Sequence, residues 1–250
     1  MEAIEHPPIF MLPGIPAHVT YAWVAMAILM VMAFAASRNL QLVPRGLQNL
    51  MEVVLEQFLG LLDELLGHEG RRYLPLIGTL GLFIFVSNLM GLVPGLMAPT
   101  SNLNTTAACA LIVFCTYHWI GIRKQGLRAY LKHFCGPIVW LAPLMFMIEI
   151  FSHLARPLSL SVRLFGNMMG GHILLAIIFL LMGFDGLIGW FLTGKLMAVI
   201  MGLPGAVLLV AFTVGFLLPL KLFVALLQAF IFCMLSMLYI AGAIEEAEHH

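Results

Sequence analysis

The chain has 250 residues, of which 62% are hydrophobic and 10% are charged, and its acidic and basic residues balance to a formal net charge of zero. A soluble domain of this length cannot hide so much apolar surface, because a folded protein still needs a wetted exterior. The balanced charge gives no indication of a nucleic-acid partner.

No Asp, Glu, Lys or Arg occurs in residues 73–122, 164–184, 196–220 or 222–244. Each of these intervals is long enough to cross a bilayer, which takes about 20 apolar residues. Lipid offers the backbone no hydrogen-bond partners and the alternating pattern of a membrane barrel is absent, so the spans are predicted to be helices. The sequence therefore predicts an all-α membrane protein, with residues 1–250 forming a single integral membrane domain.

The first span is predicted over residues 19–37, and a helix of a different kind over residues 45–68. In the second range apolar side chains recur at helical spacing and acidic side chains take the opposite side. The apolar positions are Leu47, Leu50, Val54, Phe58, Leu61, Leu62 and Leu65. Such a pattern is typical of an amphipathic helix at the membrane surface. Because its polar face is acidic, we expect it to pack on the protein's own spans rather than on anionic lipid.

Residues 74–97 and 105–122 predict two further spans joined by an uncharged link of turn-forming residues. Eight of the twelve basic residues fall in two loops: Arg38, Arg45, Arg71, Arg72, Arg123, Lys124, Arg128 and Lys132. The positive-inside rule assigns both loops to the cytoplasm. The N-terminus is then expected outside and the C-terminus in the cytoplasm.

The ranges 137–183 and 190–244 are each about twice the length of an upright span, which takes about 20 residues. They fit either four ordinary spans or two very long, steeply tilted helices. Pro157, Pro204 and Pro219 are able to break such helices or only to kink them. Periodicity alone leaves both alternatives open.

The first long range contains Glu149, Arg156 and Arg163, which are seven residues apart and therefore share one face of a continuous helix. A charge in the middle of a membrane costs about 3 kcal/mol or more, so Arg163 needs a partner, a wet cavity or a function. An arginine at a helix end would instead extend to the interface. The uncharged stretch after Arg163, with polar Asn167 and His172 inside it, favours a function.

The second long range carries Lys221 and Gln228, again seven residues apart. Taken alone, Gln228 is as well explained by an interhelical hydrogen bond, and Lys221 by extension to the interface. The pair Gly166 and Gly170 permits close approach of another backbone, and packing is the default interpretation.

The run PLSLSVRLFGNMMGGH (157–172), together with LLQAFIFCMLSMLYI (226–240), closely resembles the a subunit of F-type ATP synthases. The segment PTSNLNTT (99–106) and the order of the spans are similar to that family as well. The resemblance implies an ion-translocating stator subunit of a rotary synthase, with two offset half-channels against a ring of c subunits. It also implies about five membrane helices plus one surface helix, the last two forming a long, steeply tilted hairpin that curves around the ring.

By this resemblance Arg163 matches the family's essential arginine, which displaces the ion from the rotor carboxylate. Asn167 matches its polar neighbour, and Gln228 matches the glutamine that faces the arginine from the last helix. His172 falls in the half-channel on the external side, and Glu149 matches a carboxylate on the access path of the basic side. The implied partners are the c-subunit ring, the b-subunit peripheral stalk, the rest of the F0F1 complex and the lipid bilayer, in a bacterial inner membrane.

Lys221 departs from the family pattern, because family members often place a carboxylate seven residues before the glutamine. Asp185 is a candidate counter-charge. The resemblance implies a non-catalytic subunit of the complex, and the chain contains no phosphate-binding glycine loop. We expect no cofactor and no metal. Whether the ion is H⁺ or Na⁺ depends on a carboxylate of the partner.

Two other classes of protein are alternatives. A secondary transporter would use the same intramembrane charges, but it should show inverted repeats with matching broken helices, and the sequence has no such symmetry. An intramembrane hydrolase would have His153 and Ser159 as candidates, yet no GxSxG-type turn is present, and HEGRR (68–72) lacks the second histidine of a zinc motif.

Overall fold

The computed structural model describes residues 13–38, 40–93, 95–127, 130, 139–182 and 196–248. In these ranges the chain is helical and contains no strand. Five of the helical segments are long and apolar enough to cross a membrane. The prediction of an all-α membrane protein with about five membrane helices is confirmed. The predicted counter-charge Asp185, the loop residues Arg128 and Lys132, and the N-terminal residues 1–12 lie outside these ranges.

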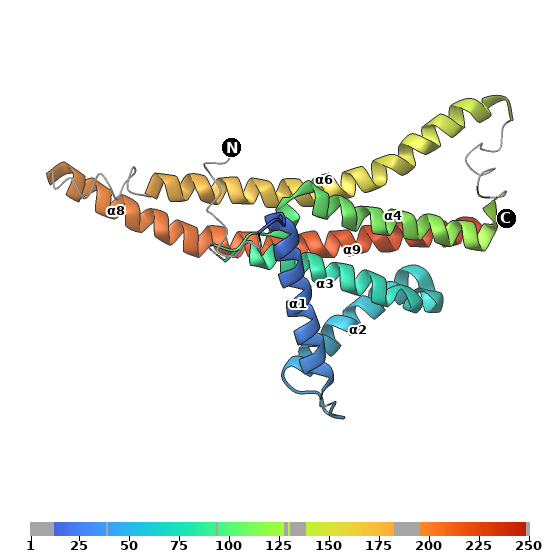
Figure 1. Ribbon diagram of the computed structural model, residues 1–250, viewed down its shortest axis with the longest axis horizontal. Helices are drawn as coiled ribbons and strands as arrows, with labels where there is room; N and C mark the ends of the chain where they lie inside the picture. Colours follow the sequence, from blue (N-terminus) through green and yellow to red (C-terminus); the bar gives the residue numbers. More distant parts are fainter. Residues whose placement is uncertain are drawn as a thin grey trace.

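Helix α1 spans Ala17–Ser37 and begins after Pro16. Proline has no backbone N–H to donate, which disfavours it inside a helix but is tolerated at the start of one. Only three of its side chains are buried, Thr20, Tyr21 and Ala25, and the last two pack with Met90 of α3. With 21 residues, α1 is about 30 Å long, which matches the hydrocarbon thickness of a bilayer. Figure 1 shows α1 crossing the longer helices rather than lying along them.

Helix α2 spans Leu47–Leu66 and is followed by a 3₁₀ segment over Gly67–Tyr73. Its apolar side, with Phe58 and Leu62, packs on a core formed with α3, α4 and α9. The loop before α2 is closed by two hydrogen bonds of 3.0 Å between the Gln48 amide and the backbone of Gln41. The helix therefore contacts the protein's own spans, and its position at the membrane surface stays a prediction.

Helix α3 spans Leu74–Met90 and α4 spans Leu103–Gln125, with a short 3₁₀ turn at Pro99–Ser101 between them. The chain leaves α3 through a turn that contains Gly95 at φ +88°, a conformation that favours glycine. Asn102 caps α4, because its side-chain oxygen accepts a hydrogen bond of 2.9 Å from the N–H of Asn104.

After a 3₁₀ turn at Val139–Leu141, helix α6 runs without interruption over Ala142–Met182, with Pro157 inside it. Helix α8 spans Leu196–Phe212, and a π turn at Thr213–Leu217 joins it to α9, which spans Leu218–Glu248. The chain thus has two very long helices instead of four ordinary spans. The prolines do not divide these helices. The helical path continues through Pro157 and Pro204, and the π turn lies beside Pro219.

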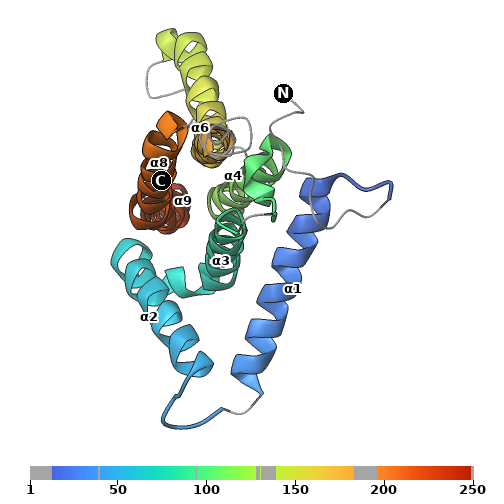
Figure 2. The ribbon, with the colours of Figure 1, turned by 90° about the vertical axis from the view of Figure 1, so that its left-hand side faces the viewer.

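Helices α6 and α8–α9 lie side by side along the long axis of the molecule, and α3 and α4 lie along them on one side (Figures 1 and 2). The segment 183–195, between α6 and α8, is outside the described residues. With 41 residues, α6 is about 60 Å long, twice the thickness of the hydrocarbon core. An upright orientation would leave half of its apolar length in water, so we expect it to be tilted steeply.

The core lies where α3, α4, α6 and α9 meet, around Ile84, Val113, Leu164 and Phe232. The opposite side of α6 is bare. Its large exposed apolar side chains include Leu144, Ile148, Phe151, Leu154, Leu158 and Val162. The packing of α6 therefore uses one face and leaves the other for lipid or another protein.

Close contact between α3 and α9 depends on Gly81. A methyl group at this position would overlap the Cys233 sulfur and lie 3.2 Å from Cζ of Phe58. We expect Gly81→Ala to cost about 1–3 kcal/mol of stability, because both neighbours are held in a packed core. The thermal unfolding midpoint of the purified protein in detergent should fall by several degrees. Gly78→Ala on the same helix, where the added methyl meets nothing within 4 Å, should leave it unchanged; equal losses would contradict this account.

Candidate functional site

The facing sides of α6 and α9 are joined by a polar pair. Nδ2 of Asn167 on α6 donates a hydrogen bond of 2.7 Å to Oε1 of Gln228 on α9. Gln228 is buried, with 4% of its surface exposed, whereas Asn167 is exposed. Two residues that the sequence placed 61 positions apart are thus in direct contact.

Arg163 lies one helical turn before Asn167 and is exposed. Among the described residues it makes no hydrogen bond and no salt bridge, whereas the adjacent Leu164 is fully buried. Its neighbours on the outer face are exposed Ser159, Val162 and Gly166. The guanidinium therefore projects from an apolar surface on which the described chain supplies no anion.

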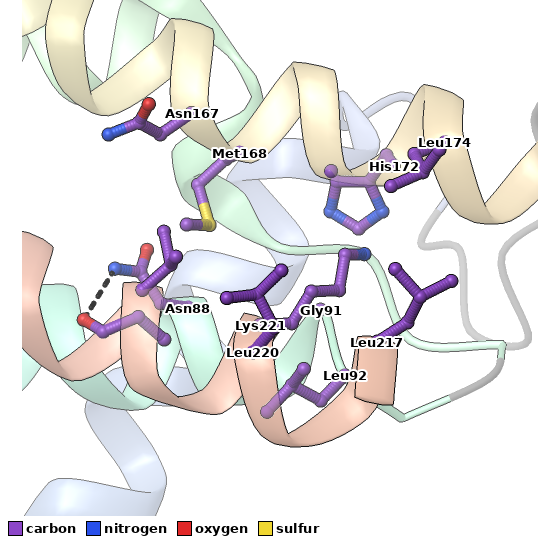
Figure 3. Close-up of a pocket in the computed structure, with 13 residues that line it drawn as sticks. Asn88, Gly91, Leu92, Asn167, Met168, His172, Leu174, Leu217, Leu220 and Lys221 are labelled. Atoms are coloured by element: carbon purple, nitrogen blue, oxygen red, sulfur yellow. Dashed lines mark hydrogen bonds between the residues drawn. The ribbon is translucent and has the colours of Figure 1, made fainter. Parts of the chain in front are cut away.

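A pocket of about 160 Å³ lies between α6, α9 and the end of α3. Its polar lining residues are Asn88, Asn167, His172 and Lys221. Figure 3 shows the Lys221 side chain extending toward the His172 ring. None of the described lining residues is acidic, so Lys221 and His172 share the pocket without a neutralising carboxylate.

Two glycines make room for these side chains. A methyl group at Gly91 would lie 3.0 Å from Nε2 of His172, and one at Gly171 would lie 2.8 Å from Cε of Lys221. The first separation is tighter than most real Cβ contacts and the second is shorter than real ones, so a side chain at either glycine would require the imidazole or the end of the lysine side chain to shift.

The wall of the pocket contains a buried hydrogen-bonded pair that sequence reasoning missed. Oγ1 of Thr100 donates to Oδ1 of Asn88 at 2.7 Å, and Nδ2 of Asn88 donates to the carbonyl of Ala225 on α9 at 3.4 Å. Both side chains are at most 2% exposed. The available signal was Asn88 itself, a strongly polar residue in a charge-free span, because such residues are expected to find partners.

A second polar group surrounds Glu149 on α6. Nε2 of His153 lies 3.2 Å from Oε1 of Glu149, and Nδ1 of His153 lies 3.0 Å from the hydroxyl of Tyr117 on α4. Cζ of Arg156 lies 5.8 Å from the ring centre of Tyr117 and 5.4 Å from that of Tyr239 on α9. The sequence singled out Glu149 but missed both tyrosines, because an aromatic residue in an apolar helix carries no signal of polar contact.

The residues considered for a hydrolase are not combined into a site. His153 is 6% exposed and faces α4, whereas Ser159 is exposed on the outer face of α6. Within the described parts of the chain, no group of three His, Cys, Asp or Glu residues is placed to hold a metal ion.

Arg163 separates the two polar groups along α6. Glu149 precedes it by 14 residues, or about 21 Å of helix, and His172 follows it by nine residues, or about 13 Å. The structure thus brings Asn167, Gln228, His172 and Lys221 together on one side of Arg163 and leaves Glu149 on the other.

Comparison with known proteins gives one consistent family. The family described as ATP synthase A chain matches residues 19–241. ATP synthase subunit a 1 of Syntrophotalea carbinolica is 48% identical over 99% of this chain and 91% of its own length. ATP synthase subunit a of Geobacter sulfurreducens is 46% identical, and ATP synthase subunit a 1 of Pelobacter propionicus is 45% identical; both alignments cover 92% of this chain and 88% of the relative.

The contact between Asn167 and Gln228 predicts a coupled effect on stability. Asn167→Leu removes a partner of the buried Gln228 amide, and we expect it to cost about 1–2 kcal/mol. Because Gln228→Leu removes the same bond, the double variant should be less destabilised than the sum of the two by at least about 0.5 kcal/mol. The free energies are measured by denaturant unfolding of the protein in mixed micelles. Strict additivity would show that the pair does not interact.

Proposed function

This chain belongs to the ATP synthase subunit a family, and we propose that it forms the two ion half-channels of the stator against the rotor ring, with Arg163 displacing the ion from the rotor carboxylate. Membership of the family makes it an integral membrane subunit of the ion-translocating F0 sector. The finer mechanism is supported by the position of Arg163, exposed on the bare face of α6 with no anion supplied by the described chain.

The chemistry of guanidinium supports this role. Arginine stays protonated at any working pH, so Arg163 does not itself relay protons. It attracts a carboxylate on a passing rotor subunit and favours the ionised form of that carboxylate, which releases the bound ion. The same fixed charge repels cations and blocks direct leakage between the two access paths.

The polar groups on either side of Arg163 supply the access paths in this proposal. The pocket with His172, Lys221 and Asn167 belongs to the external path, and Gln228 holds its inner end through Asn167. Glu149 belongs to the path from the basic side. Because the paths are offset along α6, an ion passes between them only on the turning rotor, and each charge that crosses yields about 2.3 kcal/mol per 100 mV.

The bare face of α6 is the proposed contact with the c-subunit ring. It carries Arg163 together with large apolar side chains, and Gly166 and Gly170 leave space for a neighbouring helix, since a methyl group at either would meet nothing within 4 Å. An apolar surface lets a ring of helices slide past without specific bonds that must be broken at each step. The b-subunit stalk is the other expected partner in the membrane, and the positions of the basic residues in the sequence favour a cytoplasmic C-terminus.

The secondary-transporter alternative gains no support from the pocket. The volume of the pocket, about 160 Å³, is below the roughly 300–1,000 Å³ of typical small-molecule sites. The space suits water and protons rather than an organic solute.

Removal of the charge at Arg163 tests the proposal. Arg163→Ala should abolish ATP synthesis driven by an ion gradient in proteoliposomes while the complex still assembles, because nothing then displaces the rotor ion. Arg163→Lys should also fail, since a desolvated lysine is able to lose its proton. Ser159→Ala, one turn earlier on the same face, is the control and should keep its activity. Synthesis by the alanine variant would overturn the assignment.

The role of Lys221 is open to a separate test. The charged form of Lys221 repels an incoming proton in this small pocket, so removal of the ammonium should ease entry from the external side. We expect Lys221→Met to speed passive proton flow through the F0 sector by roughly two- to fivefold, because the barrier falls while side-chain length is kept. Lys221→Arg should retain the rate of the parent protein. Slower flow in the methionine variant would instead make Lys221 a participant in conduction.

A further inference from the structure

We propose that His153, held by Tyr117, is a positioning residue that fixes the carboxylate of Glu149 in the basic-side access path. This inference rests on the proposed function, which places Glu149 in that path, and adds the residues that control its geometry. It stands on a continuous set of contacts, from a partly exposed carboxylate through a buried imidazole to a buried phenol.

The two nitrogens of His153 have different partners. Nε2 lies 3.2 Å from Oε1 of Glu149, and Nδ1 lies 3.0 Å from the Tyr117 hydroxyl. A neutral imidazole satisfies both contacts in one arrangement: Nε2–H donates to the carboxylate, and Nδ1 accepts from the tyrosine O–H. The tyrosine bond thus selects the tautomer that directs an N–H at Glu149.

The degree of burial shows which end of this set is fixed. Tyr117 is 2% exposed and His153 is 6% exposed, whereas the side chain of Glu149 is 33% exposed. The phenol and the imidazole are held by the packing of α4 against α6, so they provide a rigid support. The carboxylate reaches the accessible end, and without the imidazole its rotamers would be restricted only by its own helix.

The surroundings of His153 stiffen the support further. Its ring stacks at 5.9 Å on the Tyr117 ring and lies 5.2 Å from the His118 ring of α4. His118 in turn bonds the hydroxyl of Tyr130, and Arg156 lies over Tyr117 and over Tyr239 of α9. These groups come from α4, α6, α9 and the segment after α4, so the imidazole is held from several directions.

A purely structural link between α4 and α6 would need only the bond between His153 and Tyr117. The second nitrogen, Nε2, instead contacts the carboxylate of Glu149, which lies one helical turn earlier on α6. A hydrogen bond to a charged acceptor also contributes more than one between neutral groups. The arrangement resembles the way in which a carboxylate, an imidazole and a hydroxyl orient one another in catalytic sites, here with the carboxylate at the working end.

The test is a double-mutant cycle in the complete synthase, reconstituted in proteoliposomes and assayed for gradient-driven ATP synthesis. His153→Phe keeps a planar ring but removes both nitrogens, and we expect it to lower the rate by roughly three- to tenfold. In the Glu149→Gln background the same substitution should cause no further loss, because His153 acts through Glu149. A purely structural role would give losses that multiply.

Three more variants sharpen the result. His153→Gln keeps an N–H donor near the position of Nε2 and should restore at least about half of the activity lost in the phenylalanine variant. Tyr117→Phe keeps the packing but removes the hydroxyl that selects the tautomer of His153. Its rate of ATP synthesis should therefore lie between those of the parent protein and of His153→Phe. Tyr239→Phe is the matched control, because its hydroxyl makes no hydrogen bond among the described residues while its ring stays under Arg156; it should behave as the parent protein.

Multiplying losses, a wild-type rate in His153→Phe, or no difference between the glutamine and phenylalanine variants would each overturn the inference. Amounts of assembled complex are measured for every variant, so that a failure to fold is separated from a loss of transport. Failure of the proposed function itself would appear elsewhere, as synthesis by Arg163→Ala, and is therefore distinguishable from failure of the positioning role.

Discussion

A permanent charge on an apolar surface is the constraint on which the rest of this structure depends. Arg163 is exposed on α6, its immediate neighbour Leu164 is fully buried, and the described chain offers the guanidinium no anion. A fixed carboxylate partner would lower the energy of the charge but would also hold it in one bonded state. If the partner belongs to another molecule, as we propose, the charge stays available, and the packing of the other face of α6 on α4 and α9 offsets its cost.

The long helices follow from this arrangement. A short upright span would present its charge to a neighbouring ring over only one or two turns. The uninterrupted α6, with α8–α9 beside it, provides an extended face along which polar groups are separated by more than 10 Å. Helices α3 and α4 support that face from behind through Ile84 and Val113, and α1 crosses them as an anchor of ordinary length (Figure 1).

Much of this was predictable from residue type. The apolar intervals predicted the membrane helices. The RLFGN and QAFIF motifs pointed to Arg163, Asn167 and Gln228, of which Asn167 and Gln228 are in contact. Helix length was not predictable from periodicity, because a proline is compatible with both a break and a continued helix. The resemblance implied the long helices, and α6 does continue through Pro157. The contacts that support the site were also missed, and the sequence named His153 only as a hydrolase candidate. Thr100, Tyr117 and His153 gain their importance from contacts across helices, which periodicity within one helix does not report.

The glycines beside the pocket have a consequence for how this protein is able to change over evolutionary time. Gly171 is the space into which Lys221 extends, and Gly91 is the space beside His172. Any side chain at position 171 would have to displace the long aliphatic stem of the lysine. A lineage that acquires a larger residue there must first shorten position 221, whereas one that keeps glycine is free to exchange the lysine for other long residues. The order in which substitutions are tolerated is thus set by available volume, and the charge in this pocket is inherited together with the small residue that accommodates it.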